Sequence, residues 1–230
     1  MDISVCIPTY NEEESIVKTV KGVKKELLRQ ERVNRFEIIV SDGGSTDRTL
    51  DLLEKTVQDD RIKTTHPAER LYYGESIRDG FKSSKYSYFI VIDGDGSIPP
   101  QNLDLMLDGL QKNDVVLGRR KISDRKKIRG FLSYIYNRLN RLIFNSEISD
   151  HQCGFKGFKK KKVENLFYRT EDNHWYWDTE ILHRIQSKDI SLEEIEIEWN
   201  VAPDSTVNLV TDSLILFKKT LKFRLFGKPD

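Results

Sequence analysis

Cysteines and long hydrophobic runs are scarce in this sequence. Only 2 of its 230 residues are cysteines, Cys6 and Cys153, so no disulfide framework is expected. The longest apolar runs, such as residues 214–217, fall far short of the roughly 20 residues that a membrane-spanning helix needs. The first residues also lack a basic and then apolar signal segment. We therefore expect a cytoplasmic protein without a transmembrane helix.

An excess of charge of one sign is also absent. The chain has 38 Lys and Arg against 37 Asp and Glu, a formal net charge of +1. With this balance and no nucleic-acid-binding motif, we expect no nucleic-acid partner. Charged residues at 33% and hydrophobic residues at 37% are typical of a folded soluble domain and exclude a disordered chain. Internal repeats and low-complexity linkers are missing too, which favours a single domain.

The apolar residues alternate between two spacings along the first half of the chain. Runs of strand length occupy residues 3–7, 36–40, 62–65, 88–92 and 115–117. Helical spacing occupies the stretches between them, at residues 16–27, 51–57, 76–82 and 100–110. In the second half, helical patterns cover residues 119–145, parts of 163–187 and 208–226, and a strand pattern covers 191–199. Unbroken apolar strands that alternate with helices predict an α/β fold with a mostly parallel sheet and helices on both faces.

Acidic side chains follow three of the predicted strands at the point where each strand ends. They are Glu12, Asp42, Asp93 and Asp95. The carboxyl ends of parallel strands meet at one edge of a sheet, where ligands bind in such folds. Carboxylates that crowd there repel one another, so a cation is expected among them. For Asp42, which precedes a glycine, the role of an ordinary turn residue is an equally good interpretation.

The stretch Asp93-Gly94-Asp95 predicts a divalent metal. Two carboxylates separated by one residue can both reach a hard cation and leave coordination positions for phosphate oxygens. Mg2+ or Mn2+ suits such oxygen ligands. Zinc is disfavoured because the four histidines, at positions 66, 151, 174 and 183, show no ligand spacing. The absence of a glycine-rich phosphate loop after the first strand also argues against an NAD enzyme or a P-loop ATPase.

These motifs resemble those of a known family. Pro8-Thr9-Tyr10-Asn11-Glu12, Asp42-Gly43-Gly44-Ser45-Thr46-Asp47 and Asp93-Gly94-Asp95 look like motifs of glycosyltransferase family 2, which has the Rossmann-like GT-A fold. Two later stretches are similar to dolichyl-phosphate β-glucosyltransferases and related polyprenyl-phosphate sugar synthases: Asp150-His151-Gln152-Cys153-Gly154-Phe155-Lys156 and Trp175-Tyr176-Trp177-Asp178-Thr179-Glu180-Ile181-Leu182. The resemblance covers about residues 2–207 and is more specific for the family than for the sugar.

For the donor, the resemblance implies a nucleotide sugar and assigns its contacts by position. Residues Pro8, Tyr10 and Glu12 would line the base and the ribose. Asp42 would accept a hydrogen bond from the base, which is typically uracil in this family. Asp93, besides binding metal, would belong to the same nucleotide-sugar site, and Gln152 would face the donor.

For the reaction, the resemblance implies an inverting transfer that uses Mg2+ or Mn2+. Asp93 and Asp95 would hold the ion, with Asp95 nearest to it, and Arg120 would contact phosphate. A polyprenyl phosphate acceptor is already anionic and needs no general base, whereas a sugar hydroxyl would need one. Asp178 is the candidate base for that alternative, and it is equally well interpreted as the N-cap of a helix.

Two stretches depart from the family pattern. Arg70-Leu71-Tyr72-Tyr73-Gly74 stands where relatives carry Asn-x-Gly-Lys-Gly, so one glycine and the lysine are missing. Ala202-Pro203-Asp204-Ser205-Thr206-Val207 lacks an arginine and a lysine that mannose synthases carry. We therefore expect UDP-glucose or a UDP-N-acetylhexosamine as donor. A GDP-mannose-using dolichyl-phosphate mannose synthase and a catalytically silent nucleotide-sugar-binding module are the alternatives.

Basic residues suggest where the acceptor and a membrane surface bind. Residues 112–141 are rich in Lys and Arg, which either position a phosphate or form a solvated face. The lysine run 159–162 and the tail 208–230, which mixes Lys and Arg with Leu and Phe, are typical of contact with anionic lipid, although a docked terminal helix is the alternative for the tail. We expect residues 1–118 to bind the nucleotide sugar, residues 119–207 of the same domain to bind the acceptor, and an amphipathic helix in 208–230 to rest peripherally on the cytoplasmic face of a membrane.

Overall fold

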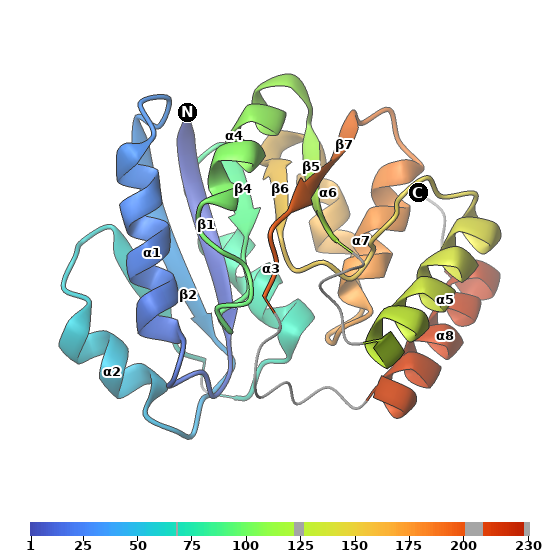
Figure 1. Cartoon of the computed structure of the whole chain (residues 1–230), viewed down its shortest axis with the longest axis horizontal. Coiled ribbons are helices and arrows are strands. Elements are labelled where there is room, and N and C mark those ends of the chain that lie inside the picture. Colours follow the sequence, from blue (N-terminus) through green and yellow to red (C-terminus); the bar gives the residue numbers. More distant parts are fainter. Residues whose placement is uncertain (68, 122–126, 201–208, 228–230) are drawn as a thin grey trace.

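The computed structural model describes residues 1–67, 69–121, 127–200 and 209–227 (Figure 1). Its strands form one seven-stranded sheet in the order β3-β2-β1-β4-β6-β5-β7. They are β1 (Asp2–Thr9), β2 (Arg35–Asp42), β3 (Ile62–Thr65), β4 (Tyr88–Val91), β5 (Val115–Arg120), β6 (Lys156–Lys159) and β7 (Leu192–Ile197). Each strand that the apolar pattern predicts is present, and β6 is added to them.

The sequence pattern did not predict β6. This strand has one large apolar residue, Phe158, and a glycine, so it lacks the apolar run that identifies a buried strand. It is antiparallel to both neighbours, with Lys156 opposite Val91 of β4 and Leu117 of β5, whereas the other strand pairs are parallel. Because β6 runs the opposite way, its first residue lies at the edge where β4 ends. The chain just before it, residues 150–155, is thereby carried to that edge.

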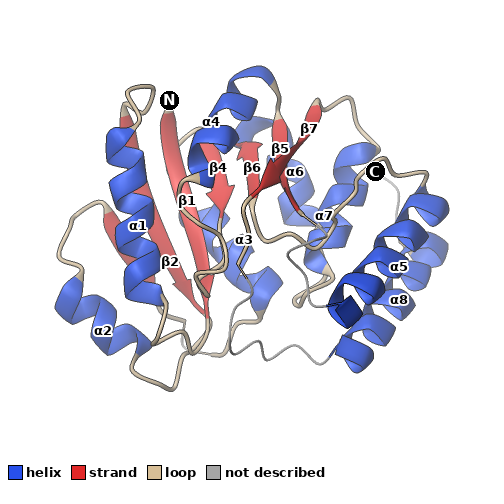
Figure 2. Ribbon diagram, viewed as in Figure 1, coloured by secondary structure: helices blue, strands red, loops and turns tan. Residues whose placement is uncertain are grey.

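Helices cover both faces of the sheet, as predicted (Figure 2). One layer consists of α1 (Ile16–Arg29), α2 (Thr49–Thr56) and α4 (Asn102–Lys112), and the other of α3 (Tyr73–Ser83), α6 (Lys160–Arg169) and α7 (Trp177–Gln186). Successive residues of β4 point to opposite faces. Ile90 therefore packs in the core under α1, α2 and α4, while Phe89 and Val91 pack in the core under α3, α6 and α7.

Two further helices, α5 (Lys127–Phe144) and α8 (Leu209–Phe226), lie side by side at one end of the molecule, beside the two layers (Figure 1). The ring centroids of Phe144 and Phe223 are 6.1 Å apart. A helix is present where the final one was predicted, but its apolar residues do not gather on one face as an amphipathic helix requires; residues 208 and 228–230 lie outside the described part of the chain. Its apolar side chains do not all face the domain, because Thr220 is buried whereas Leu225 and Phe226 are 71% and 76% exposed. Within the described ranges, no helix combines the length and the apolar composition needed to cross a bilayer.

Candidate active site

The carboxyl ends of β1, β2 and β4 lie at one edge of the sheet, because these neighbouring strands are parallel. Thr9, the last residue of β1, lies opposite Asp42, the last residue of β2. Beyond the end of β4, the backbone nitrogen of Ile92 donates a hydrogen bond to the Cys6 carbonyl oxygen at 3.0 Å, so the chain runs beside β1 almost to Asp93. The structure therefore brings the strand-end acids of the sequence to the same edge, which we call the acidic rim and define as Glu12, Asp42, Asp93 and Asp95.

The carboxyl group of Asp93 lies in a desolvated position among other acids. Burial, followed by the charges of Asp95 and Asp178, raises the pKa of Asp93 to about 7. The phenol of Tyr73 donates a hydrogen bond to Asp93 Oδ1 at 3.3 Å. Gly154 approaches the same carboxylate so closely that a Cβ atom there would lie 2.0 Å from Asp93 Oδ2. A side chain at this position would push the Asp93 carboxylate out of its place.

Asp95 lies close enough to Glu12 for its charge to affect the ionisation of Glu12. The backbone nitrogen of Ser97 donates a hydrogen bond to Asp95 Oδ1 at 2.9 Å, and the Ser15 hydroxyl donates one to Glu12 Oε2 at 3.1 Å. Burial raises the pKa of Glu12 to about 7, and the charges of Asp95 and Asp47 add to this effect. A bound cation would relieve this repulsion and favour the ionised carboxylates.

A divalent cation fits the pair Asp93 and Asp95. Both offer carboxylate oxygens, the ligands that Mg2+ and Mn2+ prefer. In the described part of the chain, no three or more His, Cys, Asp or Glu side chains are grouped as a complete metal site. The two aspartates would therefore hold an ion whose remaining positions are filled by water and by phosphate oxygens of the donor.

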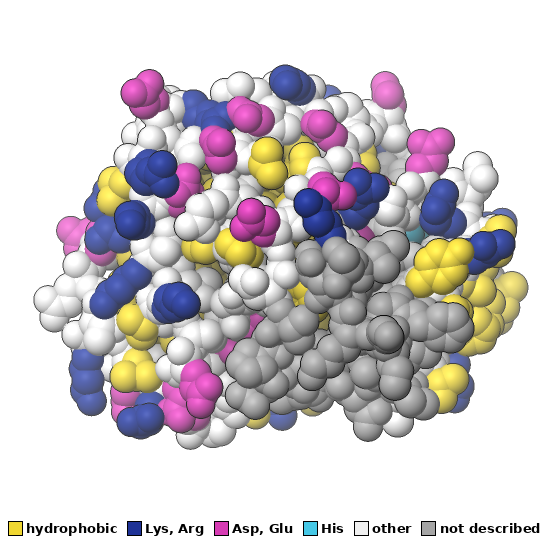
Figure 3. All heavy atoms as spheres, in the orientation of Figure 1, with side chains coloured by type: hydrophobic (Ala, Val, Ile, Leu, Met, Phe, Trp, Pro, Cys, Tyr) yellow, Lys and Arg dark blue, Asp and Glu magenta, His cyan; other side chains and the backbone are white. Residues whose placement is uncertain are grey.

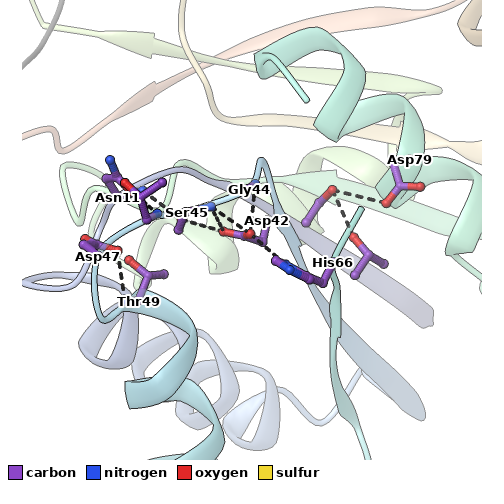
Figure 4. A network of polar contacts seen from close by, with 11 residues as sticks. Asn11, Asp42, Gly44, Ser45, Asp47, Thr49, His66 and Asp79 are labelled. Atoms are coloured by element: carbon purple, nitrogen blue, oxygen red, sulfur yellow. Dashed lines mark hydrogen bonds and ion pairs between the residues drawn. The ribbon is translucent and has the colours of Figure 1, made fainter. Parts of the chain in front are cut away.

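Asp42 is buried, and its carboxylate organises the turn that follows β2 (Figure 4). It accepts hydrogen bonds from the backbone nitrogens of Gly44 (2.9 Å) and Ser45 (3.0 Å) and from the Ser45 hydroxyl (2.5 Å). His66 Nδ1 lies 3.2 Å from Asp42 Oδ2. The interpretation of Asp42 as a turn residue is therefore correct, and its contact with a nucleotide base stays a prediction.

Tyr10 carries a stacked cation that the sequence analysis missed. The Arg70 guanidinium carbon lies 4.2 Å from the centre of the Tyr10 ring and 5.2 Å from that of Tyr72. Tyr72 stacks in turn on His174, with ring centroids 3.9 Å apart. Pro8 is buried at the end of β1. Arg70 belongs to the stretch that lacks the family lysine, so a cation is still present beside the predicted base site. The sequence could have indicated this contact, because Arg70 is followed closely by two tyrosines.

Arg120 is held by a neighbouring acid. Its Nε and Nη2 atoms donate hydrogen bonds to Asp150 at 2.8 and 2.9 Å, and Nη2 also donates to the Gln152 carbonyl oxygen at 3.0 Å. Burial alone would lower the pKa of Arg120, but the Asp150 charge raises it above its usual value. Arg120 therefore fixes the stretch that leads to Gly154. Its contact with a phosphate stays a prediction.

The prediction of Asp178 as an N-cap is wrong. The N-cap of α7 is Tyr176, and the helix begins at Trp177, so Asp178 lies in the first turn. Its Oδ1 accepts a hydrogen bond from Lys156 Nζ at 2.7 Å, and both side chains are buried. Lys156 also donates to the Cys153 carbonyl oxygen. Burial raises the pKa of Asp178, whereas the Lys156 charge opposes that rise. Asp178 is thus one half of a buried ion pair next to Asp93.

Basic residues at the end of β5 and directly after it are partly neutralised within the molecule. Arg119 and Lys121 both form ion pairs with Glu196, at 3.3 and 3.0 Å. Residues 122–126 of this basic stretch lie outside the described residues. Because Arg119 and Lys121 are paired with Glu196, fewer cations of this stretch can bind an acceptor phosphate than the sequence suggested.

The lysine run 159–162 lies away from the acidic rim. Lys159, the last residue of β6, lies opposite Tyr88, the first residue of β4, whereas the rim is at the other end of β4. Lys159 and Lys162 form ion pairs with Asp114 at 3.3 and 3.4 Å. The structure therefore gives no support to this run as a membrane contact near the site.

A mostly parallel sheet with one inserted antiparallel strand and a pair of acids at the rim defines a protein of the GT-A type. Solved structures agree with this fold. The glucosyl-3-phosphoglycerate synthase of Mycobacterium tuberculosis, crystallised with Mn2+, UDP and phosphoglyceric acid, superposes with a TM-score of 0.73 at 18% sequence identity. The match covers 99% of this chain and 79% of the synthase.

The chain belongs to glycosyl transferase family 2, whose profile matches residues 4–167. It is 32% identical to glycosyltransferase AglD of Haloferax volcanii over 229 residues, which make up 96% of this chain but 37% of AglD. It is 27% identical to the dolichyl-phosphate beta-glucosyltransferase of Saccharomyces cerevisiae, over 97% of this chain and 74% of the yeast protein. The human protein of that name is 26% identical over 86% of this chain and 67% of its own length. The chain therefore spans little more than a third of AglD.

Proposed function

We propose that this chain transfers a hexosyl group from a nucleotide sugar to a polyprenyl phosphate of the dolichyl type, with inversion. UDP-glucose or a UDP-N-acetylhexosamine is the proposed donor. The observation that carries the proposal is the pair Asp93 and Asp95 at the edge where parallel sheets bind ligands, with the pKa of Asp93 raised by burial and by the charge of Asp95. Similarity over nearly the whole chain to a dolichyl-phosphate beta-glucosyltransferase supports the acceptor.

In the proposed reaction, the donor lies along the acidic rim in residues 1–118. Pro8, Tyr10, Glu12 and Asp42 line the nucleotide. Asp93 and Asp95 would hold Mg2+ or Mn2+, which when bound neutralises charge on the diphosphate. A phosphate oxygen of the acceptor forms a bond to the anomeric carbon, and the bond from that carbon to the diphosphate oxygen breaks. The nucleoside diphosphate leaves with the electron pair.

The ion pair between Lys156 and Asp178 supports a phosphate acceptor over a sugar hydroxyl. A general base for a hydroxyl must have a free lone pair within reach of that proton. Asp178 is buried, and one of its oxygens is already bound to an ammonium group. A phosphate monoester is anionic at pH 7 and needs no such base. The acceptor would bind in residues 119–207, of which 122–126 and 201–207 lie outside the described residues.

A donor screen in the presence of polyprenyl phosphate tests this function. UDP-glucose, UDP-N-acetylhexosamines and GDP-mannose are offered in turn with Mg2+ or Mn2+, and labelled sugar is read on extracted lipid. Transfer from a UDP-hexose is expected, and Asp95→Ala should abolish it. Asp104→Asn, which changes an exposed acid on α4, is the matched control and should leave transfer unchanged.

The donor screen also has outcomes that contradict the proposal. Transfer from GDP-mannose alone, or only to a sugar hydroxyl, would replace it with one of the two enzyme alternatives. Nucleotide binding without any transfer would support the silent module. Near-normal turnover of Asp95→Ala would remove the role of the metal.

We also propose that α5 and α8 rest peripherally on the cytoplasmic face of a membrane. Figure 3 shows apolar side chains gathered at the end of the molecule where Figure 1 places these two helices. Their exposed large apolar residues are Tyr134, Ile135, Leu142, Leu214, Ile215, Phe217, Leu221, Leu225 and Phe226. Exposed Arg138, Lys218 and Lys222 lie on the same helices, and such a mixture suits anionic lipid.

Sedimentation with liposomes tests the membrane proposal. Binding to vesicles that contain phosphatidylserine is expected at low salt and should weaken at high salt, because exposed charges are screened. Phe226→Glu should weaken binding, whereas Leu105→Glu, at an exposed apolar residue of α4, is the control. Binding that neither salt nor Phe226→Glu reduces would contradict the proposal.

A further inference from the structure

The side-chain amide of Gln152 is held in one orientation. Its Nε2 atom donates hydrogen bonds to Thr179 Oγ1 at 2.9 Å and to the backbone carbonyl oxygen of Trp175 at 3.2 Å. A backbone carbonyl can only accept a hydrogen bond, so the nitrogen of the amide, not its oxygen, must face Trp175. Both amide hydrogens of Gln152 are used in these two contacts.

The other amide atom, Oε1 of Gln152, is left for a ligand. In the part of the chain that the structure describes, no donor contacts it. Gln152 is half-buried, so part of its side chain lies open to solvent. An amide oxygen can only accept. Gln152 therefore offers a hydrogen-bond acceptor, and no donor, to a bound molecule.

A buried pair of hydroxyl groups, on Tyr136 and Thr179, supports this orientation of the Gln152 amide. Tyr136 Oη on α5 lies 2.7 Å from Thr179 Oγ1 on α7, and both residues are buried. When the Thr179 oxygen accepts from Gln152, its own proton is available for Tyr136. Tyr136 lies in addition 3.4 Å from the hydroxyl of Thr220 on α8. These contacts hold the Thr179 hydroxyl in place, and its oxygen can accept from Gln152 whichever way the bond to Tyr136 runs.

Gln152 stands next to the reaction centre. Its backbone oxygen accepts a hydrogen bond from Arg120 at 3.0 Å, and Gly154, two residues later, contacts the Asp93 carboxylate. The side chain itself is half-buried. An acceptor atom at this place suits the hydroxyl groups of a hexose, which are hydrogen-bond donors.

We propose that Tyr136 and Thr179 are positioning residues. They orient Gln152 so that its side-chain oxygen accepts a hydrogen bond from one hydroxyl group of the transferred sugar. This inference rests on the proposed function, because the sugar is that of the nucleotide donor. A site built to pair with a hydroxyl group discriminates against the analogue that lacks it, since its polar atom is then left unpaired. Without the Thr179 hydroxyl, only the longer hydrogen bond to the Trp175 carbonyl oxygen holds the Gln152 amide, so the amide is less well oriented and this discrimination weakens.

Calorimetric binding of UDP-glucose and of its 2-, 3-, 4- and 6-deoxy analogues tests the proposal. In the unaltered protein, one deoxy analogue is expected to bind about tenfold or more weakly than UDP-glucose. Gln152→Leu should bring that ratio close to one, and Thr179→Val and Tyr136→Phe should each reduce it. Gln152→Leu changes a half-buried side chain and keeps the fold testable if Thr179→Val fails to fold.

Thr170→Val is the matched control, because Thr170 is another buried threonine whose hydroxyl accepts a hydrogen bond from a side chain, Trp177 Nε1, at 3.1 Å. It should leave the discrimination ratio unchanged even if it lowers stability. A ratio near one in the unaltered protein, or an unaltered ratio in Gln152→Leu, overturns the inference. Failure of the proposed function looks different: the ratio then responds to the variants, but no sugar reaches polyprenyl phosphate.

Discussion

Asp178→Asn removes the counter-charge of a buried ammonium group. Asp178 and Lys156 are 2% and 1% exposed, and their charged atoms are 2.7 Å apart. With asparagine in place, Lys156 keeps its backbone partner, the Cys153 carbonyl oxygen, but has no opposite charge in contact. Breaking a buried ion pair by removing one partner costs about 3–5 kcal/mol, a large part of the roughly 5–15 kcal/mol that stabilises a typical domain.

The double variant Lys156→Met, Asp178→Leu distinguishes the cost of leaving one buried charge unpaired from the cost of removing the whole ion pair. Replacing both charges with apolar side chains is expected to be neutral or to stabilise the protein by about 1–4 kcal/mol. Lys156→Met alone should destabilise it, because a carboxyl group then remains buried without its cation. Urea unfolding of the four proteins gives the midpoints and the slopes needed for the comparison.

Two results would refute this reasoning. A midpoint for Asp178→Asn equal to that of the unaltered protein would mean that Lys156 finds another partner. A double variant as unstable as Asp178→Asn would mean that the site cannot accept apolar side chains. Activity is compared per folded molecule: a small loss in Asp178→Asn fits a phosphate acceptor, whereas a large loss favours a sugar hydroxyl with Asp178 as its base.

Three further predictions concern other parts of the site and the core. Gly154→Ala should displace the Asp93 carboxylate and abolish metal and donor binding in calorimetry while circular dichroism stays unchanged; normal binding would show that the close approach does not matter. Arg70→Ala should weaken UDP binding by about tenfold at low salt, because it removes a cation beside Tyr10; unchanged affinity would exclude a donor contact. Burial lowers the pKa of His183 to about 3 from an ordinary 6.5, so its contribution to stability is present above pH 6.5 and is lost as the pH falls toward 3. His183→Gln should flatten the decline in unfolding free energy between pH 6.5 and 4, and an identical pH profile would contradict this.

The sequence was sufficient for six of the seven strands and for the two helical layers. Unbroken apolar runs such as residues 88–92 can only be buried on both faces, and the helical spacing between the runs supplies the covering layers. Parallel strands all end at the same edge, so the position of Asp93 and Asp95 followed from their place directly after a strand. The short strand β6 was not predicted, because its four residues include a glycine and two lysines and so show no apolar run.

The sequence by itself determined the α/β architecture and the edge at which the acids gather, because both follow from local periodicity and from the direction of parallel strands. Only the tertiary structure decided which side chains pair there. Arg120 meets Asp150 across 30 residues, and Lys156 meets Asp178 across 22. Both contacts depend on β6 running antiparallel between β4 and β5, which carries residues 150–155 to the rim. Pairing over such separations depends on the packing of whole elements against one another, and no local pattern in the chain encodes it.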